Sequence, residues 1–314
     1  MRVLVSMETQ DDLHIPVMLD EAIDALAIRA DGTYFDGTFG RGGHAREILA
    51  RLGPHGRLLL MDRDPLAVAA ARQAFAGDAR VAIRHGNFAD LSDWELPRGG
   101  LDGVLLDLGV SSPQLDNAAR GFSFQTDAPL DMRMDPSHGE NAAEFLARAS
   151  ETEIADVLWK FGEERMNRRI ARTIAERRRS TPILRTGELA ELIARTLGRR
   201  EPGKHPATRT FQALRIAVNG ELDAIELGLH GALQCLKPHG RLAVISFHSL
   251  EDRIVKQFMR GEAQPPATRR GLPPPPPVAL HLKLIGHAQF PGEVELARNP
   301  RARSAVLRVA EKLA

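Results

Sequence analysis

The sequence predicts an α/β fold in which a doubly wound, largely parallel sheet is interrupted by an inserted all-helical domain. Five apolar runs are continuous rather than alternating, which is typical of strands buried on both faces of a parallel sheet. Helical patterns separate the first of these runs, as in repeated strand–helix–strand units. The interval between the fourth and fifth runs, residues 108–240, is far longer than a single crossover unit of roughly 30 residues.

Most of the predicted sheet lies before this interval. We expect strands at residues 34–35, 57–62, 81–83 and 101–107, with a fifth at 241–247. A helix is predicted over 45–52, where Gly53 and Pro54 end the pattern. Another is predicted over 65–75, because Pro65 stands at a first-turn position that proline favours.

The interval combines an irregular segment, residues 109–140, with amphipathic helices. The helical patterns cover residues 151–161, 167–178, 188–197 and 208–235. We therefore expect a discontinuous sheet domain formed by residues 1–114 and 216–314, with residues 115–215 forming the inserted helical domain.

The last part of the chain is expected to complete the sheet. Ser249 to Asp252 has the pattern of a capping box and is predicted to begin a helix that continues to about residue 260. Five consecutive prolines, Pro273 to Pro277, indicate an extended segment. Two further strand-like runs, 278–285 and 304–309, would close the sheet as an edge hairpin.

Composition excludes several classes of protein. Hydrophobic residues make up 43% and charged residues 26% of the chain, as in an ordinary globular protein. No apolar run approaches the roughly 20 residues of a membrane span, so we expect a cytoplasmic protein without a membrane partner. The single cysteine, Cys235, excludes an internal disulfide and a cysteine-cluster metal site, and we expect no metal.

The net charge of +1 hides a local excess of basic residues. Residues 160–215 contain fifteen Lys and Arg but six Asp and Glu. A basic stretch on an otherwise balanced chain suggests a polyanionic partner. The alternative is a set of solvated helix faces, because charge runs often have no partner.

A glycine-rich segment, residues 36–44, follows the first predicted strand and precedes a helix. Glycines in such a turn bring the backbone close to a nucleotide-like cofactor, because no Cβ stands between them. Asp62 ends the second strand, where an acidic side chain can bind ribose hydroxyls. Alternatively, Asp62 and Asp64 cap the helix that begins at Pro65.

Two cofactor classes fit this turn. Residues 40–45 match Gly-x-Gly-x-x-Ala, which is also a dinucleotide pattern. Asp36 favours S-adenosylmethionine, since a carboxylate there would repel a pyrophosphate but suits a cationic cofactor. The Gly86–Asp90 segment could flank an adenine, and Asp107 ends the fourth strand where substrate would meet cofactor. Thr38 departs from the usual methyltransferase pattern Asp-x-Gly-x-Gly-x-Gly.

Several long strings closely resemble the RsmH (MraW) family of bacterial small-subunit ribosomal RNA cytosine-N4 methyltransferases. They are His14–Met18, Asp36–His44, Leu106–Asp116, Arg120–Phe124, Pro129–Asp135, Thr210–Asn219, Ile245–Lys256 and Asn299–Ser304. The resemblance runs from about residue 14 to 312, and Thr38 agrees with this family's form of the turn. Residues 261–297 lie outside it.

The resemblance implies a class I, Rossmann-like methyltransferase sheet with an inserted helical domain. It also implies S-adenosylmethionine as cofactor and 16S rRNA of the small ribosomal subunit as substrate. The residues that it assigns to the cofactor are Gly42, Gly43, His44, Asp62, Phe88, Asp107 and Gln114. A dinucleotide oxidoreductase and a non-catalytic ribosome-assembly factor remain the alternatives.

Three residues are candidates for the chemistry. The cytosine N4 amine is a poor nucleophile, because its lone pair is delocalised into the ring, so an acceptor must bind its hydrogen. Asp107 stands in the right place for that role. Asp131, with Arg133, would frame the base unless the two simply pair with each other. His248 could accept a proton but could equally position the loop before Ser249.

The RNA surface is expected in the inserted domain. Arg168, Arg169 and Arg172 lie on one predicted helix, and guanidinium groups suit phosphate contacts. Trp159 falls in an apolar helical stripe and is therefore expected in the core.

Overall fold

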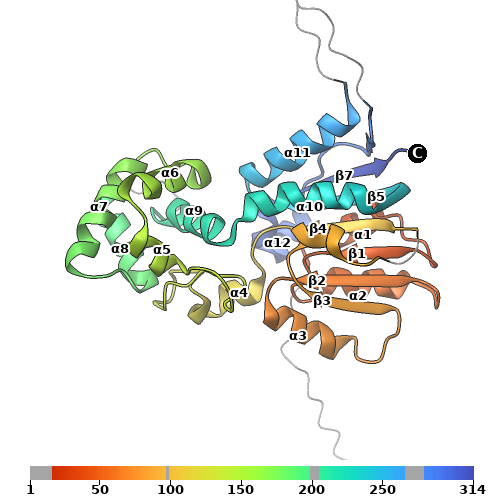
Figure 1. Ribbon diagram of the computed structural model, residues 1–314, viewed down its shortest axis with the longest axis horizontal. Helices are drawn as coiled ribbons and strands as arrows, with labels where there is room; N and C mark the ends of the chain where they lie inside the picture. The colour runs from red at the N-terminus through yellow and green to blue at the C-terminus, as the bar shows by residue number, and fades with distance from the viewer. Residues whose placement is uncertain (1–15, 97–98, 199–204, 266–278) are drawn as a thin grey trace, which may run out of the picture.

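The protein consists of a seven-stranded sheet domain beside a layer of helices, as Figure 1 shows. The computed structural model describes residues 16–96, 99–198, 205–265 and 279–314. The five predicted strands are confirmed. They are β1 (Thr33–Asp36), β2 (Arg57–Asp62), β3 (Val81–His85), β4 (Leu101–Asp107) and β5 (Leu236–Ser246).

The sheet has the strand order β3-β2-β1-β4-β5-β7-β6. Strands β1 to β5 are parallel. The predicted edge hairpin is confirmed, because β6 (Leu282–Leu284) and β7 (Val306–Lys312) pair antiparallel, and β7 also pairs antiparallel with β5. The order reverses between β1 and β4, and the carboxyl ends of those strands are where ligands bind in such sheets. The proline run lies outside the described residues.

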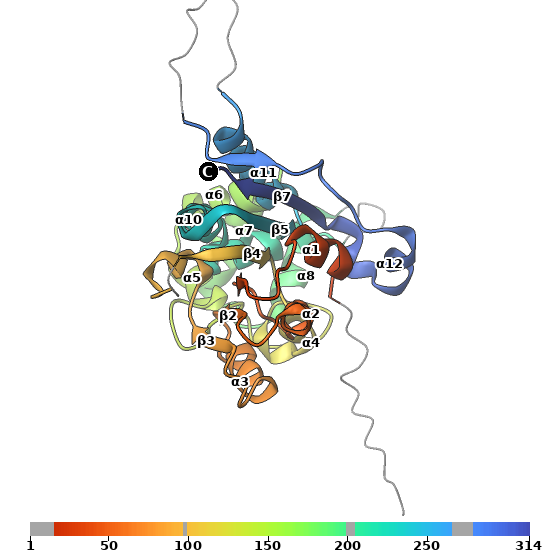
Figure 2. The same cartoon turned by 90° about the vertical axis from the view of Figure 1, so that its right-hand side faces the viewer.

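Alternate residues of each central strand belong to different cores. In β2, Leu58 and Leu60 pack with α1 (Leu19–Ala25), α2 (Gly43–Arg51) and α3 (Pro65–Ala74). Leu59 and Met61 pack on the other face, with η2 (Phe88–Asp93), α10 (Glu221–Cys235) and α11 (Ser249–Ala263). Figure 2 shows helices of these two groups on opposite sides of the sheet. Burial on both faces explains why the strands read as continuous apolar runs.

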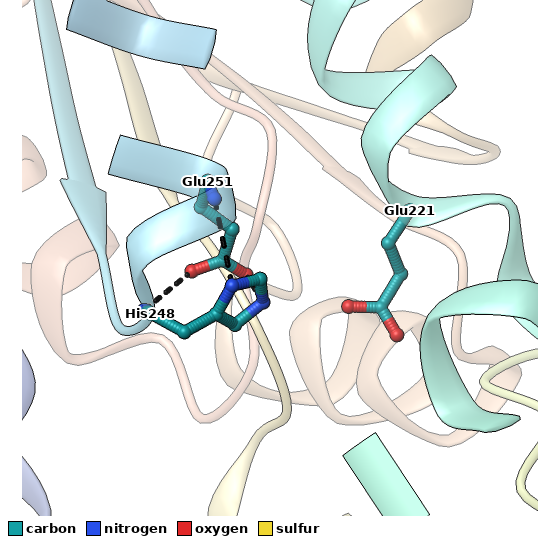
Figure 3. A group of neighbouring side chains, drawn as sticks. All are labelled: Glu221, His248 and Glu251. Carbon is teal, nitrogen blue, oxygen red and sulfur yellow. Dashed lines mark hydrogen bonds and ion pairs between the residues drawn. The ribbon is translucent and has the colours of Figure 1, made fainter. Parts of the chain in front are cut away.

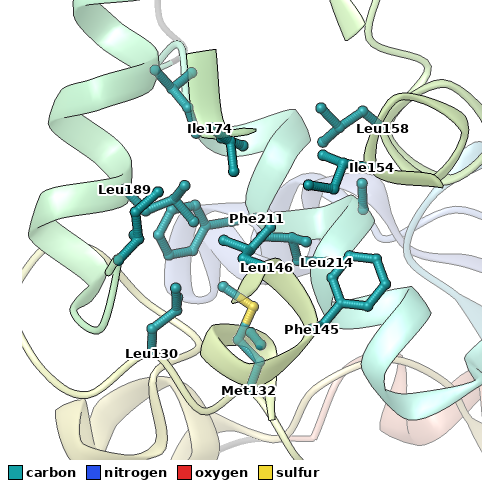
Figure 4. Packing of buried hydrophobic residues seen from close by; sticks show 14 of the residues in the cluster. Leu130, Met132, Phe145, Leu146, Ile154, Leu158, Ile174, Leu189, Phe211 and Leu214 are labelled. Carbon is teal, nitrogen blue, oxygen red and sulfur yellow. The ribbon is translucent and has the colours of Figure 1, made fainter. Parts of the chain in front are cut away.

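The helical layer has a core of its own. It is formed by α5 (Ala142–Arg148), α6 (Glu151–Gly162), α7 (Asn167–Ser180), α8 (Thr186–Leu197) and α9 (Thr208–Asn219). Figure 4 shows Phe211 and Leu214 of α9 packed among side chains of the other helices. This core extends from Phe122 to Leu214, so it supports the division of the chain near residues 115 and 215, which remains our proposal.

Two expectations about helices were wrong. Residues 208–235 form two helices, because Gly220 adopts a φ of 58° and ends α9 before α10 begins. Trp159 is not in the core: it is 55% exposed on α6. Its helix buries Ile154, Ala155 and Leu158, so the stripe that enters the core passes beside the indole ring.

Candidate active site

A cavity of about 550 Å³ opens at the carboxyl ends of β1, β2 and β4. Most of the predicted cofactor residues line it, namely Gly43, His44, Asp62, Phe88, Asp107 and Gln114. Gly42 does not belong to this wall. Its φ is 75°, and a Cβ there would lie 2.4 Å from the ring of Phe39. Gly42 therefore contributes by allowing the turn rather than by facing the cavity.

Two other positions of the turn also require glycine. Gly40 has a φ of 55°, in the left-handed region. A Cβ on Gly43 would lie only 2.0 Å from Cγ of Pro16. Glycine is therefore needed at position 40 for its backbone conformation and at position 43 for lack of space.

Asp62 fastens this turn to the end of β2. Its two oxygens accept hydrogen bonds from the backbone N–H groups of Gly40 and Asp64, both at 2.8 Å. Burial raises the pKa of Asp62 to about 6. The residue that caps α3 is Asp64, whose Oδ1 accepts from Leu66 N–H. The structure thus separates the two alternatives: Asp64 is the helix cap, and Asp62 lines the cavity.

Gln114 reaches the site through Asp64. Its Nε2 donates to Oδ2 of Asp64 at 3.0 Å, and its Oε1 accepts from Ser111 N–H. Arg120 donates to the same Asp64 oxygen at 2.7 Å. These bonds hold the segment after β4 against the start of α3, which is how a residue far along the chain comes to line the cavity.

Thr38, the departure from the usual glycine pattern, joins two strand ends. Its hydroxyl accepts a hydrogen bond from Asp107 N–H at 2.7 Å, and its own N–H donates to Oδ1 of Asp36 at 3.0 Å. Asp36 is buried and does not line the cavity. Burial raises the pKa of Asp36 to about 7. Its repulsion of a pyrophosphate near neutral pH is therefore weaker than the sequence argument assumed.

Asp107 lines the cavity and keeps one carboxylate oxygen, Oδ1, buried without a hydrogen-bond partner among the described residues. Burial raises the pKa of Asp107 well above its usual value, and the charges of Asp36 and Glu251 add to this effect. Its Oδ2 lies 3.8 Å from Nδ1 of His44. Burial lowers the pKa of His44 to about 4, so the imidazole is neutral at physiological pH.

The other two predicted catalytic residues lie outside the cavity wall. Asp131 forms an ion pair with Arg133, with Nε and NH2 both donating at 2.8 Å, which is the alternative that the sequence left open. His248 is the N-cap of α11 and accepts from Glu251 N–H through Nδ1. The cap is therefore one residue earlier than the predicted Ser249.

One group of side chains has the spacing of metal ligands. Glu221, His248 and Glu251 offer ligand atoms within 4.8 Å of one another, and Figure 3 shows Glu221 reaching from α10 toward the other two. Arg215 already supplies a cation there, because its Nε and NH2 donate to the two oxygens of Glu221, both at 2.8 Å. A guanidinium in this place disfavours a metal ion.

The chain as a whole matches a family model, described as the MraW methylase family, over residues 11–313. The chain belongs to this family. The ribosomal RNA small subunit methyltransferase H of Xanthomonas oryzae pv. oryzae (strain PXO99A) is 59% identical over 300 residues, which are 96% of this chain and 89% of that protein. The protein of the same name from Stenotrophomonas maltophilia (strain K279a) is 58% identical and is covered to 93%.

Solved structures also resemble this member of the MraW methylase family. An rRNA methylase from Streptococcus thermophilus superposes with a TM-score of 0.44 at 11% identity, covering 96% of this chain and 99% of that one. None of the described helices is both long and apolar enough to cross a membrane.

The cavity of this MraW family member fits S-adenosylmethionine. A glycine turn without intervening side chains and the carboxylate of Asp62 suit a nucleoside. Asp107, in the same wall, has one oxygen without a hydrogen-bond partner among the described residues. The same wall contains residues that the sequence did not identify, notably Glu221 and Glu251. The sequence placed Glu221 inside a helix predicted over residues 208–235 and Glu251 in a capping box, and nothing local in the sequence shows that α10 and α11 begin at one cavity.

Proposed function

We propose that the protein transfers a methyl group from S-adenosylmethionine to the exocyclic N4 amine of a cytidine in 16S rRNA of the small ribosomal subunit. The match to the MraW methylase family over residues 11–313 carries this proposal. The cavity at the carboxyl ends of β1, β2 and β4 supports it. The substrate places the reaction in the cytoplasm, where ribosomal subunits are assembled.

The residues of the first strand–helix unit bind the cofactor. The backbone around Gly40 and Gly43 contacts the cofactor, and Gly42 gives this turn its conformation. His44 lines the same part of the cavity. Asp62 accepts hydrogen bonds from the ribose hydroxyls. Bound there, S-adenosylmethionine supplies an electrophilic methyl group on a positively charged sulfur.

Phe88 and Gln114 position the adenine end of the cofactor and the segment that follows β4. The ring of Phe88 is fixed by α10, since a Cβ on Gly228 would lie 2.4 Å from it. Gln114 tightens the segment after β4 over the same cavity through Asp64. These contacts hold the reactants in one orientation, and such positioning can lower a barrier by several kcal/mol.

Asp107 acts on the target amine. Its free Oδ1 accepts an amine hydrogen, which localises the nitrogen lone pair as the methyl group arrives. Asp131 and His248 support the site without touching the base in this proposal. Asp131 fixes Arg133, and His248 fixes the beginning of α11.

The basic face of the helical layer binds the RNA backbone. Arg168, Arg169 and Arg172 are exposed on α7, and Arg172 lies 3.7 Å from Glu151. Glu163, at the end of α6, pairs with Arg253 of α11 at 3.1 Å, so α7 begins close to the sheet domain. A cytidine that enters the cavity must be unpaired or flipped out of its helix.

Labelled S-adenosylmethionine tests this function directly. Purified protein is incubated with naked 16S rRNA, with assembly intermediates and with mature small subunits, and the nucleosides are analysed by mass spectrometry. We expect N4-methylcytidine from at least one of these substrates. RNA binding without product on all three would support the assembly-factor alternative, and calorimetric binding of NAD in place of S-adenosylmethionine would support the oxidoreductase.

A further inference from the structure

A second pocket lies at the edge of the sheet that β6 forms. Its volume is about 300 Å³, and its lining residues fall within 256–264, 284–288 and 308–309, which belong to α11, to β6 with the segment after it, and to β7. None of these residues lines the cavity described above. We call it the edge pocket, and Figure 2 shows α11 beside β7 at this edge.

The walls of the edge pocket combine apolar and basic side chains. Met259 and Val309 are buried and give it an apolar inner surface. Lys256, Arg260 and His287 also line it and are exposed. None of the described residues that line it is acidic. This combination suits a nucleotide, whose base can lie on apolar side chains while its phosphate binds guanidinium and ammonium groups.

Two of these basic groups are not neutralised by the protein. The side chains of Lys256 and Arg260 form no ion pair or hydrogen bond with the described residues. Arg308, in contrast, donates to both oxygens of Asp252, at 2.6 and 3.0 Å. Glu262, near the end of α11, pairs with a histidine at 2.6 Å. Because these acids already have basic partners, the positive charge of Lys256 and Arg260 is available to an anion.

The same helix joins the edge pocket to the candidate active site. Glu251, in its first turn, lines the cavity. Arg253, Lys256 and Arg260 follow at spacings of three and four residues, which place them on one exposed face of α11. Arg253 pairs with Glu163 at 3.1 Å, but both side chains are more than half exposed, so this pair is weak. A line of basic side chains thus leads from the cavity to the edge pocket over a helix rise of about 14 Å.

We propose that the edge pocket binds one nucleotide of the substrate RNA, a few nucleotides along the strand from the cytidine that enters the cavity. Lys256 and Arg260 bind its phosphate, and its base lies on Met259 and Val309. The proposal rests on the proposed function, because that function supplies the RNA. Binding at two places along one strand fixes the direction of the strand, which adds to the selection of one cytidine.

Two variants separate this role from that of an ordinary solvated surface. Lys256→Glu combined with Arg260→Glu reverses the charge at the edge pocket. Ala288→Leu fills the pocket without changing any charge, because Ala288 lines it. An acidic protein segment is the competing occupant of the edge pocket, and RNA binding would then depend on neither change.

The control combines Lys283→Glu with Arg195→Glu, which changes the net charge by the same amount as the double reversal. Lys283 lies on β6, but its side chain points to the face opposite the pocket, because successive strand residues alternate. Arg195 lies on α8, in the helical layer. The control therefore tests whether RNA binding responds to net charge alone.

Filter binding to 16S rRNA across salt concentrations measures the affinity and its salt dependence. For the double reversal we expect the slope of log affinity against log salt to fall by between about one and two, because two phosphate contacts are lost. For Ala288→Leu we expect about tenfold weaker binding, the effect of losing one stacked base, at the wild-type slope. In both, the RNA concentration for half-maximal methylation should rise with the dissociation constant, while S-adenosylhomocysteine affinity and unfolding temperature match the control.

Wild-type RNA affinity and salt slope in the double reversal would overturn the proposal, as would an equal loss in the control. Unchanged RNA binding by Ala288→Leu would also overturn it, because the pocket would then hold no base. If the double reversal lowers the unfolding temperature, Lys256→Gln combined with Arg260→Gln decides by the same slope. A wild-type protein that binds 16S rRNA without methylating it would refute the proposed function, and the binding comparison would still decide on the edge pocket.

Discussion

At the scale of single residues, the site is defined by buried acids that hold protons unusually well. Burial raises the pKa of Asp36 to about 7 and that of Asp62 to about 6, and it raises the pKa of Asp107 well above its usual value. A group whose pKa is raised in the folded state stabilises the fold at low pH and loses that contribution as pH rises through the folded pKa. These acids therefore contribute least to the stability of the fold near and above neutral pH.

S-adenosylmethionine is a cation, and a bound cation favours ionised acids, so its binding should strengthen as the pH rises. We predict that S-adenosylmethionine binds about tenfold more tightly at pH 7 than at pH 5, because Asp62 is mostly protonated at the lower pH. Calorimetry at the two pH values measures the difference. In Asp62→Asn the affinity should be lower at pH 7 and almost independent of pH, and tighter wild-type binding at pH 5 would contradict the assignment.

The residues that the sequence could identify are those whose role is local. Gly40, Gly43 and Asp62 follow directly from strands that are visible as apolar runs, so position along the chain predicts position in the site. Gln114 was named by the family resemblance alone. Glu251 could not be found as a cavity residue, because its place in the wall depends on α11 beginning beside Gly109, a contact across more than a hundred residues.

At the scale of elements, α7 is the helix of the helical layer that we expect to contact the RNA. It buries Ile170 and Ile174 against the helical core, and its exposed side carries Arg168, Arg169 and Arg172. Not every arginine of this helix is free for a partner. Arg178 donates to the carbonyls of Leu146 and Ala149 and so holds the end of α5.

We predict that reversing the charge of Arg168, Arg169 and Arg172 weakens RNA binding and lowers its salt dependence. Each lost phosphate contact should reduce the slope of log affinity against log salt by about one. Filter binding across salt concentrations measures this slope, and calorimetry should show unchanged S-adenosylmethionine affinity. Arg195→Glu, in which an equally exposed arginine is reversed on α8, is the control. Loss of cofactor affinity alone would exclude α7 as the RNA surface.

Elements were predictable where a single pattern decides them. The central strands β1, β2 and β4 were found because burial on both faces leaves few polar residues in them. The break at Gly220 was missed, because apolar spacing continues through it and only the φ of 58° ends the helix. The exposure of Trp159 was missed for a related reason: one helical turn offers several apolar positions, and packing against α7 and α9 selects among them.

At the scale of the whole molecule, Gly220 joins the helical layer to the sheet domain. Nothing lies within 4 Å of a Cβ built there, so Gly220→Ala introduces only backbone strain. We predict a loss of about 1 kcal/mol in the free energy of unfolding, the cost of a left-handed conformation for a residue with a Cβ. Urea denaturation measures it.

Gly261→Ala is the matched comparison. Gly261 also has open space around its Cβ position but lies inside α11 with ordinary helical geometry. Alanine should therefore stabilise the protein by about 0.5–1 kcal/mol. Effects of the same sign at both glycines would show that the conformation of Gly220 does not control its tolerance to substitution.

The long excursion between β4 and β5 has a consequence for how the chain folds. These strands are neighbours in the sheet, yet residues 108–235 separate them. Closing a flexible loop of about 130 residues costs about 4 kcal/mol of chain entropy, and a loop of about 35 residues costs about 1 kcal/mol less. Because the core from Phe122 to Leu214 condenses most of that loop, the helical layer favours strand pairing even where it does not touch the sheet.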